Sequence, residues 1–264
     1  MSVQVTPDLV LKHVANSPVL SRAYEALETD EEVQELVRMS NIVAVGRLKY
    51  NDHGVVHARI VSGAALELFD ILVGAGVTPS TVADGTTASV DEAKLVVLLS
   101  AYLHDVGNSI HRVNHEALGA LLVKDLLTRI ISDVIPGVGR RRYLLRQEVI
   151  HGIYATETNV RALTVEAGVV KVADGTDMAE GRARIPYKLG RLDMHAMSAT
   201  SIKKVFIGRG SSRPARIYVV MDDYAGLFQF EAVLKPKILT SGIEGYVEVY
   251  INVGGVERRA FPGG

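Results

Sequence analysis

The spacing of apolar side chains divides the chain into a long helical part and a shorter part that contains strands. Within residues 53–75, apolar side chains from Val56 to Leu72 recur every four positions, as on the buried face of a helix. Residues 95–104 are apolar nearly all round, which indicates a helix that is buried on every side. Further helices fit residues 113–133, 139–156, 160–178 and 190–201.

The pattern changes near residue 201. Residues 204–208 and 215–221 are rich in Val, Ile and Tyr, as strands are. Residues 225–239 suit a helix, and residues 247–253 alternate apolar and polar side chains with the period of two that marks a half-buried strand. The tail therefore predicts a strand–strand–helix–strand unit.

These two parts predict a mainly α fold with two domains. We expect a helical domain over residues 1–200 and a small α+β domain over residues 201–264. A unit of about 55 residues buries little apolar surface by itself. We therefore expect the tail to pack on the helical part or on a second subunit of a homo-oligomer.

Composition narrows the chemistry that the chain can carry. The 264 residues include no cysteine, which excludes disulfides, zinc fingers, iron–sulfur clusters and thiol nucleophiles. Eight histidines remain, so any metal site must combine them with Asp and Glu. The formal net charge of −1 argues against a dedicated nucleic-acid binder.

The chain is also expected to be a cytoplasmic protein that does not enter a membrane. Its first residues lack the basic start and apolar run of a signal peptide. Its most apolar stretch is about half of the ~20 residues that a membrane-spanning helix needs.

Histidine and aspartate side chains follow apolar stretches at several points. His104 and Asp105 end the most apolar predicted helix, where a charged carboxylate is costly unless something pairs with it. A divalent metal ion would supply that partner. His57 lies in the first turns of a long predicted helix, His151 lies in another, and Asp174 follows a further apolar run.

The segments around these residues resemble the HD superfamily of metal-dependent phosphohydrolases. AYLHDVGN matches the family's apolar–His–Asp–apolar–Gly block, and VADGTDMAEGRARIP resembles its closing Asp segment. HEALGALLV, which begins at His115, resembles the segment that supplies a further His in two-metal members, and VIHGIY resembles the next His-bearing helix. The resemblance covers roughly residues 50–190, and with the tail included the chain is similar to archaeal-type HD proteins.

Two departures separate the chain from the cyclic-dinucleotide branch of that superfamily. Asn108 stands where those members usually carry Lys, and His151 is not followed by a Gly-Tyr-Pro loop. A cyclic-di-GMP substrate is therefore not expected.

The resemblance implies a reaction, a cofactor and a set of ligands. The reaction is hydrolysis of a phosphomonoester or phosphodiester, in a nucleotide or a small phosphorylated metabolite, by a metal-activated hydroxide. Imidazole and carboxylate ligands without thiolate suit two divalent ions of Mn, Fe, Co, Ni or Zn. The implied ligands are His57, His104, Asp105 and Asp174 for the first ion, and Asp105, His115 and His151 for the second.

Other residues near these ligands are candidates for contact with the substrate. Arginine can clamp a phosphate with two hydrogen bonds, whereas lysine acts as a point charge. The candidate catalytic residues are Asp105, Asp177 and Lys171, where Asp177 could instead be an outer-shell partner of the metal ligands. The candidate substrate-binding residues are Asn108, His111, Arg112, Arg182 and Arg184, although His111 could equally be a loop residue.

A different class of function fits the same residues. The helical domain could be a nucleotide-binding regulatory module on a non-catalytic HD scaffold, with the tail as an oligomerisation or partner surface. The tail has no evident catalytic residues, which favours this second reading. His13, His53 and His195 are expected to be ordinary core or surface residues.

Overall fold

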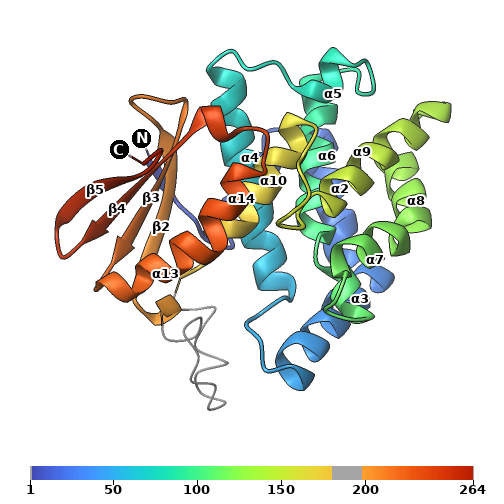
Figure 1. Ribbon diagram of the computed structural model, residues 1–264. Coiled ribbons are helices and arrows are strands. Elements are labelled where there is room, and N and C mark those ends of the chain that lie inside the picture. The colour runs from blue at the N-terminus through green and yellow to red at the C-terminus, as the bar shows by residue number, and fades with distance from the viewer. Residues whose placement is uncertain (1, 180–197, 264) are drawn as a thin grey trace.

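A bundle of helices lies beside a five-stranded sheet in the computed structural model, which describes residues 2–179 and 198–263 (Figure 1). The helices of the bundle are α1 (Leu9–Val14), α2 (Pro18–Thr29), α3 (Glu31–Asn41), α4 (Val55–Gly74), α5 (Ser80–Ala83), α6 (Val90–Leu103), α7 (His115–Leu122), α8 (Lys124–Val134), α9 (Arg142–Tyr154) and α10 (Val165–Thr176). A π-helical turn (Ile42–Arg47) continues α3, and a 3-10 turn (Val106–Ser109) follows α6. The mainly helical character of the prediction is confirmed.

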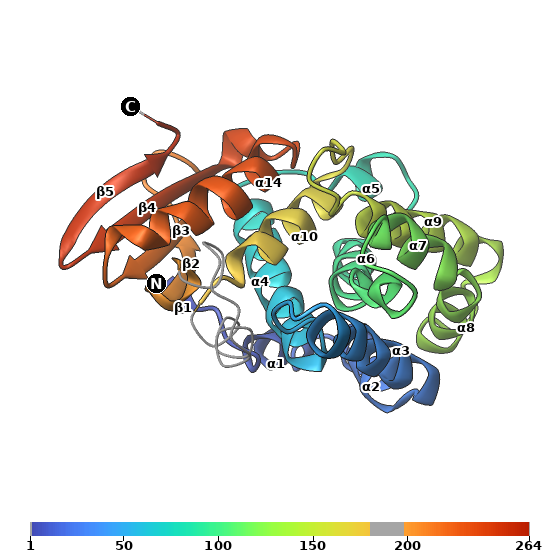
Figure 2. The same ribbon diagram turned by 60° about the horizontal axis from the view of Figure 1, so that its bottom comes forward.

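Helix α6 is the centre of the bundle. It contacts α2, α4, α9 and α10, which surround it in Figure 2. Every side chain from Leu95 to Leu103 is buried, because an apolar surface on all sides of a helix is stable only when other helices cover all of it. The prediction of a fully buried helix here is confirmed.

The helix predicted over residues 113–133 is two helices. They meet at Val123, whose ψ of 1° leaves the α-helical range. Val123 is itself fully buried, whereas Leu121 and Leu122 before it are exposed. The break lets α7 and α8 each turn a separate apolar face to the core.

The sheet has the strand order β1-β2-β3-β4-β5. Its strands are β1 (Ser2–Gln4), β2 (Ile202–Arg209), β3 (Ala215–Met221), β4 (Val247–Val253) and β5 (Val256–Phe261). Strands β3 and β4 run parallel, and the other neighbours run antiparallel. The predicted strand–strand–helix–strand unit is present, and β1 and β5 extend it on both edges.

The connection between β3 and β4 is helical. It consists of α13 (Leu227–Gln229), a π-helical segment (Phe230–Leu234) and α14 (Lys235–Leu239), which lie on the side of the sheet that faces the bundle (Figure 1). Helices α4 and α10 of the bundle contact this unit, so the tail packs on the helical part as expected. Since β1 comes from the first residues, the sheet joins both ends of the described chain. A domain boundary after residue 200 would therefore separate β1 from the other four strands of its own sheet.

None of the helices in the described parts of the chain is long and apolar enough to cross a membrane.

Candidate metal centre

Three helices bring four of the predicted ligands together. His57 lies in the first turn of α4, His104 and Asp105 follow the last residue of α6, and Asp174 lies in the last turn of α10. His57 Nε2 is 3.3 Å from His104 Nε2, 3.3 Å from Asp105 Oδ2 and 3.3 Å from Asp174 Oδ1. His104 Nε2 lies 3.5 and 3.6 Å from the same two oxygens. Neighbouring ligand atoms have about this spacing when each bonds one metal ion at about 2.0–2.2 Å.

The Nδ1 atoms of His57 and His104 each have a hydrogen-bond partner outside the cluster of ligand atoms. His57 Nδ1 lies 2.6 Å from Asp177 Oδ2, and His104 Nδ1 lies 2.8 Å from the Ala101 carbonyl oxygen. Both Nδ1 atoms therefore donate, which leaves the lone pair of each Nε2 directed into the cluster. The two Nε2 atoms lie 3.3 Å apart, and their lone pairs repel one another unless a cation lies near both. The imidazole orientation is that of metal ligands.

The carboxylates of the cluster, buried at Asp105 and largely buried at Asp174, favour the ionised form. Asp105 Oδ2 is inaccessible to solvent and makes no hydrogen bond among the described residues. Burial favours the neutral acid, yet the adjacent imidazoles of His104 and His53 hold the pKa of Asp105 well below its ordinary range. The pKa of Asp174 is also held well below its ordinary range, against its burial, by Lys237 and His104. A buried carboxylate oxygen without a hydrogen bond fits a bound divalent cation, and His57, His104 and Asp105 lie close enough together to share one.

Lys237 is a neighbour of this cluster that the sequence did not suggest. Its Nζ lies 2.7 Å from Asp174 Oδ2 and 3.0 Å from the Thr156 carbonyl oxygen. It comes from α14 in the tail, 63 residues after Asp174. No local pattern relates two residues at that separation, so only the packing of α14 on α10 reveals the pair.

His53 is a second neighbour of the cluster, at a position where the sequence predicts only an ordinary core or surface residue. It is buried in the loop before α4, and its ring centre lies 5.8 Å from that of His57. Its Nδ1 donates to the Asn51 carbonyl oxygen at 2.7 Å. Its spacing of four residues before His57 is the only sequence signal for this position. His13, by contrast, lies between Glu67 and Asp70, 3.0 Å from each. These two residues belong to the C-terminal half of α4, whereas His57 lies at its start.

Of the two further ligands predicted for a second ion, the structure brings His115 to the cluster. His115 Nε2 lies 3.2 Å from Asp105 Oδ1 and 3.0 Å from Arg112 Nη1. Although burial opposes protonation, Asp105 and Glu116 raise the pKa of His115 to about 9. His151 has a different partner, since its Nε2 accepts a hydrogen bond from the Leu163 backbone N–H at 3.1 Å.

The residues predicted to contact substrate have different surroundings. Arg112 is about one third exposed and lies near Asp105, with 4.0 Å between Nη1 and Oδ1. It donates to Asn108 Oδ1 at 3.2 Å. Asn108 is fully buried and donates to the backbone and side chain of Asp105, so it orients that carboxylate. His111 is exposed and accepts from the Val113 N–H, as a loop residue does. Arg182, Arg184 and His195 lie outside the described residues, as does most of the predicted helix 190–201.

Lys171 holds a loop instead of facing the cluster. Its buried ammonium donates to the Glu157 carbonyl oxygen at 2.7 Å and to the Val160 carbonyl oxygen. Burial lowers the pKa of Lys171 to about 8. Its donors are thus committed to the segment after α9, which does not support the catalytic role predicted for it.

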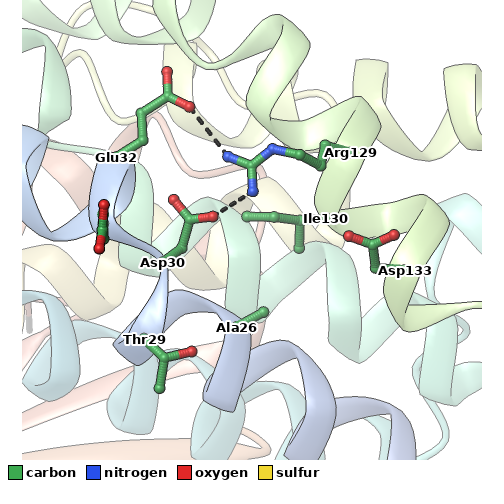
Figure 3. Close-up of a pocket in the computed structure, with 8 residues that line it drawn as sticks. Ala26, Thr29, Asp30, Glu32, Arg129, Ile130 and Asp133 are labelled. Carbon is green, nitrogen blue, oxygen red and sulfur yellow. Dashed lines mark hydrogen bonds and ion pairs between the residues drawn. The ribbon is translucent and has the colours of Figure 1, made fainter.

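A separate hollow lies between the α2–α3 junction and α8 (Figure 3). Arg129 pairs there with Asp30 and Glu32, and Glu31 and Asp133 also line the surface. None of the predicted ligands lines it. Its acidic side chains would repel a phosphate group, so this hollow does not compete with the His/Asp cluster as a candidate site.

Comparison with known proteins agrees with the geometry. The family model described as HD domain matches residues 57–179, which contain His57, His104, Asp105 and Asp174. The chain belongs to the HD domain family, and the resemblance seen in the sequence is confirmed.

One relative matches over most of its length. The chain is 43% identical over 230 residues to the uncharacterized protein MJ1020 of Methanocaldococcus jannaschii, and the match covers 87% of this chain and 88% of that protein. No solved structure matches the chain.

The contact between His57 and Asp177 gives a first prediction. Replacing Asp177 with asparagine should weaken metal binding about 10–100-fold, because the carboxylate that fixes the His57 ring and increases its basicity is lost. Calorimetric titration with Mn²⁺ would measure this affinity. Asp84→Asn, a change at an exposed carboxylate, serves as the control and should bind Mn²⁺ like the unmodified protein. Equal affinity in both variants would show that Asp177 does not support the ligand.

Proposed function

We propose that this protein is a metal-dependent phosphohydrolase that acts on a phosphomonoester or phosphodiester, in a nucleotide or a small phosphorylated metabolite. The convergence of His57 Nε2, His104 Nε2, Asp105 Oδ2 and Asp174 Oδ1 carries this proposal. Two imidazoles and two carboxylates suit Mn, Fe, Co, Ni or Zn.

A divalent ion held by these four residues would lower the pKa of a water molecule and offset negative charge on the phosphoryl group. The chain's own residues prepare the site for this chemistry. Asp177 and the Ala101 carbonyl hold the two rings so that both Nε2 atoms face inward. Asn108 holds the Asp105 carboxylate through Oδ1, which leaves Oδ2 for the ion. The ligands are therefore oriented before any substrate arrives.

Arg112 is the described residue best placed to receive a phosphate. Its guanidinium is partly exposed, while its Nη1 lies 4.0 Å from Asp105 at the edge of the cluster. A guanidinium can donate two parallel hydrogen bonds to phosphate oxygens. With a net charge of −1, the protein exerts little long-range attraction on an anion, so the attraction to phosphate has to be local.

A second ion, held by Asp105, His115 and His151, is the finer part of the proposal. The 3.2 Å separation between His115 Nε2 and Asp105 Oδ1 supports it. Its formation requires Arg112 to leave His115 and His151 to release the Leu163 N–H. The number of ions bound per chain therefore reports directly on this rearrangement.

Metal analysis combined with a substrate panel tests the proposed function. Protein purified without chelator should contain at least one transition-metal ion per chain, and two if the second site fills. Phosphomonoesters, phosphodiesters and nucleotides would be assayed with Mn²⁺, Co²⁺ or Ni²⁺, and turnover should stop with a chelator and return with metal. Protein that binds no metal would refute the proposal. Tight nucleotide binding without turnover of any substrate would instead favour the regulatory module.

A further inference from the structure

The C-terminal unit reaches the metal centre through one side chain. Lys237 lies on α14, and its side chain is as deeply buried as that of Asp174, with 12% and 14% exposed respectively. Its Nζ divides its hydrogen bonds between Asp174 Oδ2, at 2.7 Å, and the Thr156 carbonyl oxygen, at 3.0 Å. The ammonium therefore links α14 to both α10 and the end of α9.

The two carboxylate oxygens of Asp174 have different neighbours. Oδ2 accepts from Lys237, while Oδ1 faces His57 Nε2 and His104 Nε2 at 3.3 and 3.6 Å. A carboxylate held at one oxygen by a charged donor has little freedom to rotate. The side chain is thus kept in the orientation that presents Oδ1 as a ligand.

Two glycines on α10 permit α14 and the residues after it to come this close. A Cβ on Gly175, the residue after Asp174, would lie 3.0 Å from Leu234 Cδ1 and 3.3 Å from Lys237 Cδ. A Cβ on Gly168, seven residues earlier on the same face, would lie 2.4 Å from the Ser241 carbonyl oxygen. The face of α10 beside Asp174 is therefore shaped to receive the segment that carries Lys237.

We propose that Lys237 is a positioning residue through which the C-terminal unit sets the metal affinity of the centre, by fixing the carboxylate of Asp174 from the side opposite the ion. This inference rests on the metal centre of the proposed function and extends it to the tail. Charged groups that orient a ligand carboxylate commonly change metal affinity about 10–100-fold. The tail then completes the centre without contributing a ligand to it.

Metal affinity of the full-length protein tests this inference without any substrate. Lys237→Met, which keeps the length of the side chain and removes its charge, should bind Co²⁺ about 10–100-fold more weakly and should alter the visible spectrum of the Co²⁺ complex. Lys237→Arg, which retains a charged donor, should bind more tightly than Lys237→Met. Lys235→Met is the matched control, because Lys235 lies on the same helix and pairs only with Glu231 among the described contacts; it should bind Co²⁺ like the unmodified protein.

Co²⁺ binding by Lys237→Met with unchanged affinity and an unchanged spectrum would overturn the inference. If Lys237→Met does not fold, Lys237→Gln provides the same comparison, since its amide can still donate to the Thr156 carbonyl. Failure of the proposed function is distinguishable: an unmodified protein that binds Co²⁺ but hydrolyses no phosphate ester would refute the activity, while weakened binding in Lys237→Met would still support the role of Lys237.

Discussion

Replacing Asp105 with alanine should abolish tight metal binding and lower the hydrolysis of phosphate esters by at least about 10³-fold. Asp105 is the residue that the two parts of the site share, since Oδ2 faces His57 and His104 while Oδ1 faces His115. In the proposed site, its loss would remove one ligand of the first ion and the bridge to a second. Elemental analysis and an assay with the best substrate of the panel would measure both losses.

The control for this change is Asp133→Ala. Asp133 is an exposed carboxylate on α8 that lines the separate acidic hollow, so its removal should leave both metal content and turnover unchanged. An Asp105→Ala protein that retains its metal and more than a tenth of its activity would show that the cluster is not the reactive centre.

Replacing Glu248 with glutamine should lower the free energy of unfolding by about 2–3 kcal/mol at pH 7. Glu248 is a fully buried residue of β4 that accepts hydrogen bonds from the Ser211 and Ser212 N–H groups, at 2.9 and 3.1 Å, and from Arg216 Nε at 2.7 Å. Burial opposes its ionisation, but these donors lower the pKa of Glu248 to about 2 in the folded protein. The ionised form is therefore strongly preferred in the folded state.

The same values fix how this stabilisation depends on pH. The unfolded chain has the ordinary pKa of 4.5, so the contribution of Glu248 is complete above that pH and is lost as the pH falls toward 2. Urea denaturation of both proteins at pH 7 and pH 3 should show a smaller difference at pH 3. Glu257→Gln, on the exposed edge strand β5, should show little difference at either pH. A gap between Glu248→Gln and the unmodified protein that does not change with pH would contradict this account.

The sequence predicted those helices and strands whose buried surroundings require a regular pattern of apolar residues. Helix α6 is surrounded by other helices, so its apolar character on all sides identified it. Strand β1 consists of three residues, Ser2–Gln4, which form a strand only because β2 lies beside them. In β5, residues 256–259 are all exposed, so no alternation of apolar and polar residues marked the strand.

The sequence suggested site residues that share an ordered motif, but it gave no signal for partners that depend on packing. His57, His104, Asp105 and Asp174 follow from an ordered motif, and the structure brings them together. Lys171, a charged residue near that motif, was a candidate catalytic residue. Its ammonium instead donates to three backbone carbonyl oxygens in the segment after α9. A sequence does not indicate where unpaired carbonyls of a distant loop will lie.

The pairing of β1 with β2 has a consequence for the order of events during synthesis. Ser2 pairs with Gly208 and Val3 pairs with Ile207, so the first strand has no partner until some two hundred further residues have been made. At about 5–20 residues per second, that delay is of the order of 10–40 s. The helices that carry His57 and His104 can associate during this interval. The sheet closes, and Lys237 reaches Asp174, only after the tail has left the ribosome, so the contact between the C-terminal unit and the His/Asp cluster is among the last to form.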